Sequence, residues 1–295
     1  MLASRIRRVG IIANFTKPSA SSRVQTAANL IRRAGRTVLT DAPTARLAGI
    51  KATRCRSVAS LARAADLILV VGGDGTMLRA ARELEGAQTP LLGINVGGLG
   101  FLTAVSASDI EEALEKVWRG AYQLESRALI EASGKSRGKA FRSLALNEFV
   151  ISRRNISRLI ELETSVDGQF LTRYRGDGLI VSSPTGSTAY SLAAGGPAVV
   201  PTAEVFLLTP ICPHALSNRS LVVNLRSHID LKVVSVQPES TLSADGQLER
   251  ELSANDRITI RRSRNSVCLA HLEGASFFET LRHKLNWSGS NLPNE

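Results

Sequence analysis

A turn of small residues carrying one acid, Gly72-Gly73-Asp74-Gly75, joins an apolar run at 67–71 to a helix-forming segment at 77–84. The run resembles a strand buried on both faces, and the turn would open a helix. The glycines permit positive φ and leave no Cβ in the way, so backbone N–H groups could approach a phosphate at the helix N-terminus. Asp74 would then meet a cation, a water on Mg²⁺ or a hydroxyl proton. A tight turn with Asp74 as the helix N-cap is the alternative.

This turn does not fit the two common nucleotide-binding patterns. A Walker A loop has Lys-Ser or Lys-Thr after its last glycine, whereas Thr76-Met77 follows Gly75. The dinucleotide fingerprint also fails, because Leu78 stands three places after Gly75. Analogy with these folds therefore does not identify the ligand.

Two further segments place polar groups where a ligand could use them. Asn147 and Glu148 lie inside an apolar run, and a neighbouring amide and carboxylate suit two ribose hydroxyls. Neighbouring backbone groups could equally satisfy them. Residues 183–197 are rich in small and hydroxyl side chains and predict a turn with a short helix that offers N–H donors, the Tyr190 ring and, just upstream, Asp177. A plain Ser/Thr-rich turn is the alternative there.

The elements that must position these groups fall into two patterns. The first hundred residues alternate strands at 8–14, 36–40, 67–71 and 90–95 with helices, as in a doubly wound, Rossmann-like sheet. A helix is expected at 21–34, with Ser21 and Ser22 as cap candidates, and others at 57–65 and 106–119. A second glycine cluster at 97–100 ends a strand expected beside the first, so the two loops could line one crevice, although the cluster could simply be a hinge.

From Tyr122 onward short β-rich runs and turns dominate until a final helix at 276–284. We therefore expect an α/β domain at 1–104, a mainly β domain at 105–272, and a C-terminal helix and tail at 273–295 that returns to the first domain. A basic start, Met1 to Arg8, runs straight into a strand, which favours a cytoplasmic protein over a cleaved leader. No apolar run approaches the length of about 20 residues that a membrane span needs.

Composition narrows the function classes. The 295 residues carry a formal charge of +11, but the arginines are scattered in small groups and only 13 aromatic residues (8 Phe, 3 Tyr, 2 Trp) could stack on bases. Such a surface would attract a polyanionic small ligand as well as a nucleic acid. Three cysteines without Cys-x-x-Cys spacing argue against a disulfide framework and a zinc site, and Cys212 and His214 are interpreted as structural.

Taken together, the ordered motifs resemble those of the NAD kinase family over nearly the whole chain. They are Gly72-Gly73-Asp74-Gly75-Thr76, Leu146-Asn147-Glu148, Arg175-Gly176-Asp177-Gly178, residues 184–191, residues 209–214 and Asp245-Gly246-Gln247. Gly-Gly-Asp-Gly alone is shared with diacylglycerol and sphingosine kinases, whereas the segments at 185–190 and 209–214 are more specific. Two positions depart from the family: Ser220 stands where many relatives have Pro, and Ala193 where Ser is common.

The resemblance implies transfer of the ATP γ-phosphoryl group to the 2′-hydroxyl of the adenosine ribose of NAD, with Mg²⁺ bound mainly through the ATP phosphates. It implies a fold of an α/β domain plus a β-sandwich. It also implies NAD and ATP as substrates, a homodimer or homotetramer, and neither a nucleic-acid nor a membrane partner. Asp74 would be the general base or would orient the hydroxyl, and Asn147 and Glu148 would hold a ribose. The other implied binding residues are Gly73, Gly75, Arg79, Arg158, Arg175, Asp177, Thr188, Ala189, Tyr190, Ser191, Leu192, Ala193 and Gln247. A diacylglycerol-type lipid kinase and a non-catalytic NAD-binding regulator are the alternatives.

Overall fold

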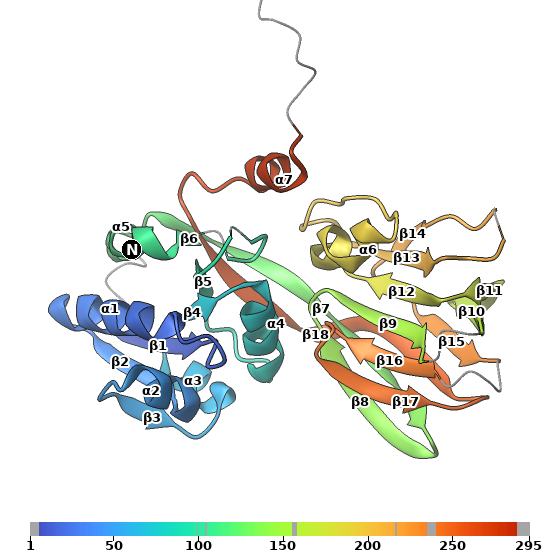
Figure 1. Ribbon diagram of the computed structural model, residues 1–295, viewed down its shortest axis with the longest axis horizontal. Helices are drawn as coiled ribbons and strands as arrows, with labels where there is room; N and C mark the ends of the chain where they lie inside the picture. The colour runs from blue at the N-terminus through green and yellow to red at the C-terminus, as the bar shows by residue number, and fades with distance from the viewer. Residues whose placement is uncertain are drawn as a thin grey trace, which may run out of the picture. The chain divides into compact units, whose positions relative to one another are not determined.

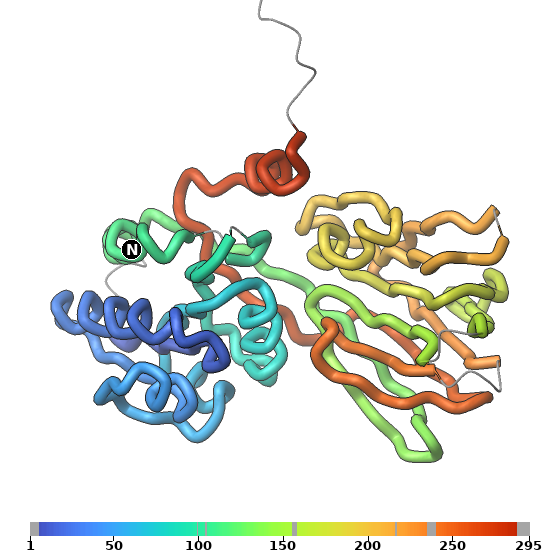
Figure 2. The backbone as a smooth tube through the Cα atoms, viewed as in Figure 1, coloured from blue at the N-terminus to red at the C-terminus, as the bar shows by residue number. Residues whose placement is uncertain are grey.

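The computed structural model of the protein describes residues 6–98, 100–103, 105–154, 158–215, 217–234 and 240–287. The chain forms two compact units: unit 1 comprises Met1–Ser126 and Val267–Glu295, and unit 2 comprises Arg127–Ser266. The chain leaves unit 1 within β7 (Tyr122–Ser136) and returns to it within β18 (Arg257–Leu272). These two long strands pair with each other, as the green and red tubes of Figure 2 show.

Unit 1 is built on a parallel sheet with the strand order β18-β5-β4-β1-β2-β3 (Figure 1). From β1 the chain first runs outward through β2 and β3 and then returns to the other side of β1 with β4, which creates a switch point between β1 and β4. The strands are β1 (Arg8–Ala13), β2 (Thr37–Asp41), β3 (Thr53–Cys55), β4 (Leu67–Gly72), β5 (Leu91–Asn95) and β6 (Val105–Ser106). The helices are α1 (Ala20–Arg33), α2 (Ala42–Ala48), α3 (Val58–Ala64), α4 (Asp74–Glu83), η2 (Ala107–Asp109), α5 (Ile110–Arg119) and α7 (Phe277–Leu285).

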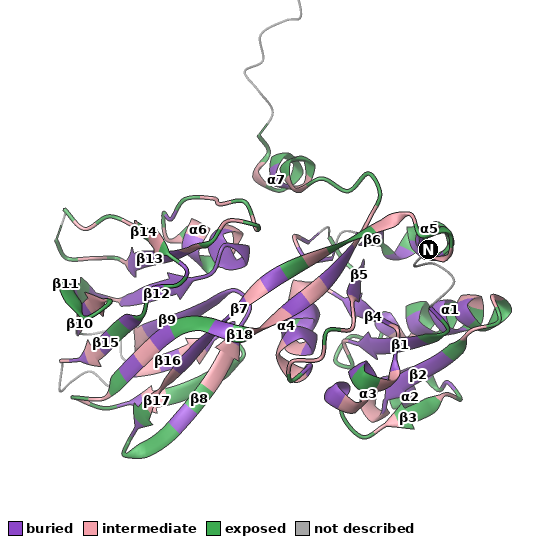
Figure 3. Ribbon diagram, turned by 180° about the vertical axis from the view of Figure 1, so that it is seen from behind, coloured by how far each residue is buried: buried purple, intermediate pink, exposed green. Residues whose placement is uncertain are grey.

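Helices cover both faces of this sheet, which explains why its central strands are apolar throughout. Buried residues of α1 and α5 share one core with the β4 residues Leu67 and Leu69. On the other face Gly10 faces α3, where an added methyl group would lie 3.0 Å from Ile68 and 3.3 Å from Leu61. Every residue of β4 is buried, as the purple strand in Figure 3 shows. The doubly wound α/β fold expected from the sequence is confirmed.

Unit 2 is a β-sandwich. One sheet has the order β14-β13-β12-β9-β16-β17, and β7, β8, β10, β11, β15 and β18 belong to the other. Their common core contains Phe149 and Phe206 from the first sheet and Ile130 and Ile260 from the second. The strands not yet given are β8 (Lys139–Ala145), β9 (Glu148–Arg153), β10 (Ile160–Val166), β11 (Gln169–Gly176), β12 (Gly178–Ser182), β13 (Val205–Ile211), β14 (Leu221–Asn224), β15 (Ile229–Val233), β16 (Ser240–Ala244) and β17 (Leu248–Leu252). The short helices η3 (Thr185–Thr188) and α6 (Tyr190–Ala193) follow β12.

The structure differs from the sequence-based elements in two places. The helix expected at 21–34 begins at Ala20, and its N-cap residue Ser19 makes no side-chain capping hydrogen bond, so the expected caps at Ser21 and Ser22 are wrong. The pattern also missed the pair α2 and β3. This helix is only seven residues long, and β3 is an edge strand of three residues with no buried position, so neither shows a clear hydrophobic period.

The unit boundaries also differ from the expected domain limits at 104 and 272. Residues 105–126 and 267–272 belong to unit 1. The reason is packing, since Leu114 and Val117 of α5 lie in the core of the parallel sheet. The C-terminal helix α7 belongs to unit 1 as expected, and its Phe277 ring contacts Phe101 with ring centroids 6.4 Å apart.

Candidate active site

The glycine turn with Asp74 lies at the carboxyl end of β4, beside the switch point of the parallel sheet where ligands of such folds bind. Gly73 is the N-cap of α4, and Asp74 is its first residue, so Asp74 is not the N-cap. Its carboxylate turns to the loop after β5. Oδ2 accepts the N–H of Phe101 at 2.9 Å, and Oδ1 accepts the N–H groups of Leu102 at 3.1 Å and Thr103 at 3.2 Å and the Thr103 hydroxyl at 3.0 Å.

Glycines allow this close approach because they have no Cβ. None of Gly72, Gly73 and Gly75 has a positive φ, so the left-handed conformation that glycine permits is not used in this turn. A methyl group on Gly72 would overlap the Thr76 side chain, and one on Gly100 would overlap the Asp74 carboxylate. A methyl group on Gly73 would meet nothing within 4 Å. Open space therefore lies beside the first turn of α4, and the N-terminus of a helix favours an anion.

The two glycine loops do follow neighbouring strands, because β4 and β5 pair in parallel. Asn95 at the end of β5 organises the second loop: its amide nitrogen donates to the Gly98 carbonyl at 2.7 Å and the Thr103 hydroxyl at 2.8 Å, and its oxygen accepts the Gly97 N–H at 2.6 Å. A loop fixed by its own side chain and by Asp74 is not a simple hinge.

Arg79 connects the same turn to the neighbouring strand β1. Its Nη2 donates to the Ala13 carbonyl at 3.0 Å, its Nη1 lies 3.5 Å from Glu83, and its guanidinium stacks over the Phe15 ring at 5.3 Å. A partly exposed cation is therefore held at the carboxyl ends of β1 and β4, where phosphate groups would be neutralised.

In unit 2, Asp245 holds the turn that carries Asn147 and Glu148. Its Oδ1 accepts the N–H groups of Asn147 at 2.8 Å and Glu148 at 3.2 Å, and its Oδ2 accepts the N–H of Leu146 at 3.0 Å. Asp245 is 7% exposed and has a φ of 51°. From the sequence, only Gln247 of this segment was expected to reach a ligand. An acid in an Asp-Gly turn gives no local signal that it bonds a distant segment, because Asp is common in turns for local reasons.

Glu148 is a buried carboxyl group without a donor on one oxygen. It is 6% exposed, and its Oε2 has no hydrogen-bond partner among the described residues. Burial first, and the negative charge of Asp245 second, raise the pKa of Glu148 to about 8. At neutral pH the group is therefore protonated and can donate as well as accept. The side-chain amide of Asn147 likewise makes no hydrogen bond with a described residue, so the backbone does not satisfy this pair.

The Ser/Thr-rich segment packs directly on the Asn147 turn. The Ser183 N–H donates to the Asn147 carbonyl at 2.8 Å, and the Ser183 hydroxyl donates to the Leu146 carbonyl at 2.6 Å. A methyl group on Gly186 would overlap the Asn147 carbonyl, so the approach requires glycine at this position. The structure thus brings the segment starting at Ser183 and the Asn147-Glu148 pair together.

Within this segment the expected ligand residues differ in accessibility. Thr188, Ala189, Leu192 and Ala193 are partly or fully exposed, and the Tyr190 side chain is 45% exposed. Ser191 is completely buried, and its hydroxyl lies 2.9 Å from that of Thr209. Ser191 therefore holds the segment to β13 through a buried hydrogen bond.

Asp177 and Arg175, which the resemblance assigns to one nucleotide site, each pair with a different residue. Asp177 pairs with Arg153 at 3.0 Å, and Arg175 lies 3.6 Å from Glu161. Arg153 was missed by the sequence analysis because only the antiparallel register of β9 and β12, with Ser152 opposite Gly178, brings it to this end of the sheet. Arg158 is exposed, and Gln247 is exposed on the turn after β16.

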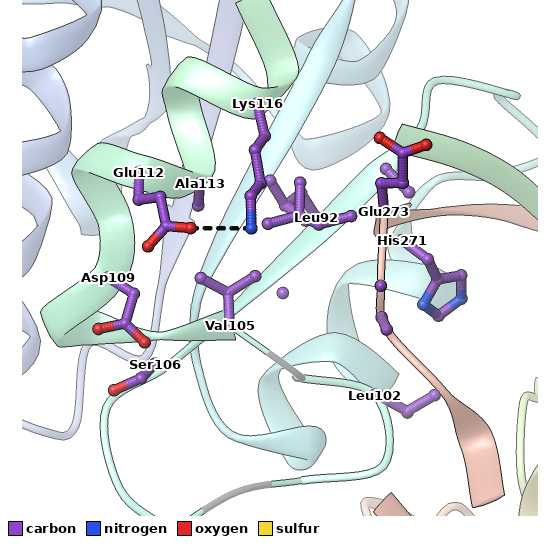
Figure 4. A pocket seen from close by; sticks show the side chains of 15 residues that line it. Leu92, Leu102, Val105, Ser106, Asp109, Glu112, Ala113, Lys116, His271 and Glu273 are labelled. Carbon is purple, nitrogen blue, oxygen red and sulfur yellow. Dashed lines mark ion pairs between the residues drawn. The ribbon is translucent and has the colours of Figure 1, made fainter. Parts of the chain in front are cut away.

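A cavity of about 340 Å³ in unit 1 lies behind the loop that holds Asp74. Figure 4 shows the paired Glu112 and Lys116 of α5 on one wall and His271 and Glu273 on another, with Leu102 from the loop also at its edge. The Leu102 residue therefore both donates its N–H to Asp74 and lines this cavity. Its remaining lining residues are Leu92, Gly93, Val105, Ser106, Asp109, Ala113, Ala270, Leu272, Gly274 and Ala275.

The described residues contain no group of three or more His, Cys, Asp or Glu placed to hold a metal ion. Cys55, Cys212 and Cys268 are free thiols, and His214 donates its backbone N–H to the Arg175 carbonyl at 2.8 Å. Within the part of the chain that the structure describes, no helix is long and apolar enough to cross a membrane.

Both halves of the chain match known protein families. Residues 9–122 match the ATP-NAD kinase N-terminal domain, and residues 146–272 match the ATP-NAD kinase C-terminal domain. The NAD kinase of Acidovorax sp. is 41% identical over 289 residues, covering 95% of this chain and 97% of the relative. The NAD kinase of Thiobacillus denitrificans is 39% identical over 280 residues, covering 95% of this chain and 96% of the relative.

Solved structures agree with these matches. Yeast NADH kinase complexed with NADH superimposes with a TM-score of 0.87 at 25% identity, covering 98% of this chain and 90% of that chain. An NAD kinase from Archaeoglobus fulgidus in complex with ATP gives a TM-score of 0.76 at 27% identity, covering 96% and 100%. The fold and the turn with its acid thus define a two-domain nucleotide kinase. More particularly, the chain belongs to the NAD kinase family.

Proposed function

We propose that the protein transfers the γ-phosphoryl group of ATP to the 2′-hydroxyl of the adenosine ribose of NAD, producing NADP and ADP. The observation that carries this proposal is the turn at the end of β4, where Asp74 is fixed beside a helix N-terminus that has open space in front of Gly73. Family membership over the full chain supplies the identity of the substrates. Phosphoryl transfer needs positioning and charge neutralisation more than a protein nucleophile, which suits these groups.

On the donor side, the N-terminus of α4 with Gly73 and Gly75 would bind phosphate oxygens, and Arg79 would add a fixed positive charge. Asp74 would orient the attacking hydroxyl and accept its proton as the bond to phosphorus forms. Its carboxylate oxygens already accept four hydrogen bonds from the second loop, so the direction of the carboxylate is set before a substrate arrives.

On the acceptor side, Asn147 and Glu148 would bind ribose hydroxyls. A protonated Glu148 offers one O–H donor and acceptor oxygens, and the unengaged Asn147 amide offers both kinds of group. Tyr190 and the exposed parts of residues 188–193 would contact the bases or ribose, and Gln247 would reach the same ligand from its turn. Arg158, Arg175 and Asp177 would line the nucleotide site, with Arg153 holding Asp177 in place.

A divalent cation, Mg²⁺ or a similar ion, would be held mainly by the ATP phosphates. The donor set of the chain fits this arrangement, since the described residues offer no cluster of acids that could cage an ion by themselves. When bound, the ion would neutralise charge on the β- and γ-phosphates. We also propose a cytoplasmic homodimer or homotetramer without nucleic-acid or membrane partners.

The decisive experiment mixes the purified protein with NAD, ATP and Mg²⁺ and follows NADP formation. Asp74→Asn should lower kcat by about 10²–10⁴-fold while NAD binding is largely kept, because the variant removes a proton acceptor from the reacting hydroxyl. Asp109→Asn, an exposed acid at the start of α5, is the matched control and should turn over normally.

The alternative functions predict different results in this assay and in a parallel assay with lipid vesicles. Unchanged turnover in Asp74→Asn would refute the role of Asp74. Binding of NAD without NADP formation by the wild-type protein would favour a non-catalytic regulator. Phosphorylation of diacylglycerol in vesicles, with no NADP formed, would favour a lipid kinase.

A further inference from the structure

A second cavity, of about 630 Å³, opens on unit 2 and differs sharply in character from the first. Its lining residues come from β7, β8, β18 and the turn before β15, and we call it the arginine cavity. Its lining residues are Glu131, Ser133, Arg142, Arg226, His228, Arg261, Arg262, Ser263 and Arg264. None of these residues belongs to the proposed NAD and ATP site.

The arginine cavity carries a strong excess of positive charge. Five arginines and one glutamate line it, which gives five minus one, or +4, with His228 neutral. Glu204 lies outside the lining and pairs with Arg262 at 2.7 Å and Arg226 at 3.8 Å, so even with it the excess is +3. Arg264 has no acidic partner among the described residues. Such a concentration of guanidinium groups is self-repelling unless an anion joins it.

Glu131 fixes the geometry of two of these arginines. It is 1% exposed, and its Oε1 accepts from Arg261 through Nη2 at 2.9 Å and Nε at 3.3 Å, while its Oε2 accepts from Arg142. Burial alone would raise the pKa of Glu131, but the two guanidinium groups hold it below its ordinary value. The carboxylate therefore stays charged and orients the two guanidinium groups. Because these side chains are already ordered, less conformational entropy is lost when a ligand binds.

The hydrogen-bonding groups left over in the arginine cavity are almost entirely donors. Nη1 of Arg261, Nε and Nη1 of Arg142, and the whole Arg264 guanidinium make no hydrogen bond with a described residue. Ser263 is only 6% exposed, and its hydroxyl oxygen accepts the Asn265 N–H at 3.1 Å, which leaves its proton for another partner. Both oxygens of Glu131 are engaged. A matching ligand must consist of acceptor oxygens and carry several negative charges.

We propose that the arginine cavity binds a pyrophosphate group, either free or as the diphosphate of a nucleotide, independently of the proposed kinase site. A pyrophosphate presents only acceptor oxygens, matches the fork of each guanidinium, and carries enough charge to offset the excess of +3 to +4. A single carboxylate would leave most of that excess uncompensated. The cavity lies within the size range of small-ligand sites, roughly 300–1,000 Å³.

The proposal is tested by titrating pyrophosphate, and separately ADP, into the full-length protein by calorimetry at low ionic strength. Arg264→Gln should weaken pyrophosphate binding about tenfold, because it removes a charged donor pair. Ser263→Ala should weaken it about threefold, since it deletes one neutral hydrogen bond. Arg173→Gln is the matched control: it removes the same charge from an exposed strand position, where Arg173 pairs with Glu163 at 3.1 Å and with no other acid among the described residues.

The readouts separate this site from the kinase site. Turnover of ATP and NAD without added pyrophosphate should be unchanged in Arg264→Gln, so failure of the kinase assignment would leave this test intact. If Arg264→Gln weakens the binding of ADP as much as that of pyrophosphate, the ligand is a nucleotide diphosphate. If it weakens the binding of pyrophosphate alone, the ligand is the free anion. Equal pyrophosphate affinity in wild type and Arg264→Gln overturns the proposal, as does an equal loss in Arg173→Gln. A change only in oligomeric mass overturns it in favour of an interface between copies.

Discussion

Replacing Asp245 with Asn tests whether this residue builds the acceptor side of the site. Its Oδ1 accepts two backbone N–H groups, and its Oδ2 accepts the N–H of Leu146 at 3.0 Å. An amide oxygen can take the place of Oδ1, but the NH₂ group would then face the Leu146 donor. One buried N–H loses its acceptor, which costs about 1–3 kcal/mol. The same change removes the negative charge that contributes to the raised pKa of Glu148, so that pKa should fall, while burial keeps it above its ordinary value.

Two measurements separate these effects. Urea unfolding should show the loss of about 1–3 kcal/mol, and the pH at which the KM for NAD changes should move to lower pH than in wild type. Asp256→Asn is the control, because Asp256 also accepts backbone N–H groups in a turn, from Ser253 at 2.8 Å and Arg137 at 3.3 Å. If stability falls but the pH dependence of KM stays in place, Asp245 is structural only. If neither changes, the reasoning about the turn is wrong.

Two further predictions concern the same groups. Gly100→Ala would make a methyl group overlap the Asp74 carboxylate, so kcat should fall at least about tenfold with little change in the KM for NAD. Gly98→Ala is the control and should have normal kcat, because a methyl group there meets nothing within 4 Å. Normal kcat in Gly100→Ala would contradict the fixed position of Asp74. Glu148 has a pKa of about 8 in the folded protein against an ordinary value of 4.5. Between these pH values the folded protein therefore keeps a proton that the unfolded chain releases. The free energy of unfolding should fall as pH rises across this range, by up to about 1.4 kcal/mol per pH unit. Glu148→Gln should lack this decline in urea unfolding followed across that range, and an identical slope in both proteins would show that Glu148 is not the group responsible.

The sequence predicted the fold class because the segments with the clearest apolar pattern are also the most deeply buried. The run at 67–71 became β4, in which every position is buried, and the alternation of strands and helices became the doubly wound sheet. The segment rich in hydroxyl residues likewise predicted one short helix, where the structure has the two short helices η3 and α6. Local periodicity is sufficient for such elements, because burial of one face dictates the residue pattern.

The partners of the key acids could not be predicted, because they depend on long-range contacts. Asp74 is bound by residues 27 to 29 positions away, and Asp245 by residues 97 to 99 positions away. Nothing local distinguishes Asp245 from an ordinary Asp-Gly turn. The pairing of Asp177 with Arg153 likewise follows from strand register, which the side-chain pattern of a strand buried on both faces does not specify.

The hydrogen bonds of Asp74 resolve a difficulty that the sequence raised, namely an anion placed where a phosphate should bind. A carboxylate pointing along the axis of α4 would repel the phosphate and compete for the helix N–H groups. In the structure the carboxylate turns toward the loop after β5, where four donors surround it. The helix N-terminus would then remain open to a phosphate, and open space lies in front of Gly73. The second glycine loop, and Gly100 in particular, would therefore allow one turn to hold both a phosphate and a proton acceptor.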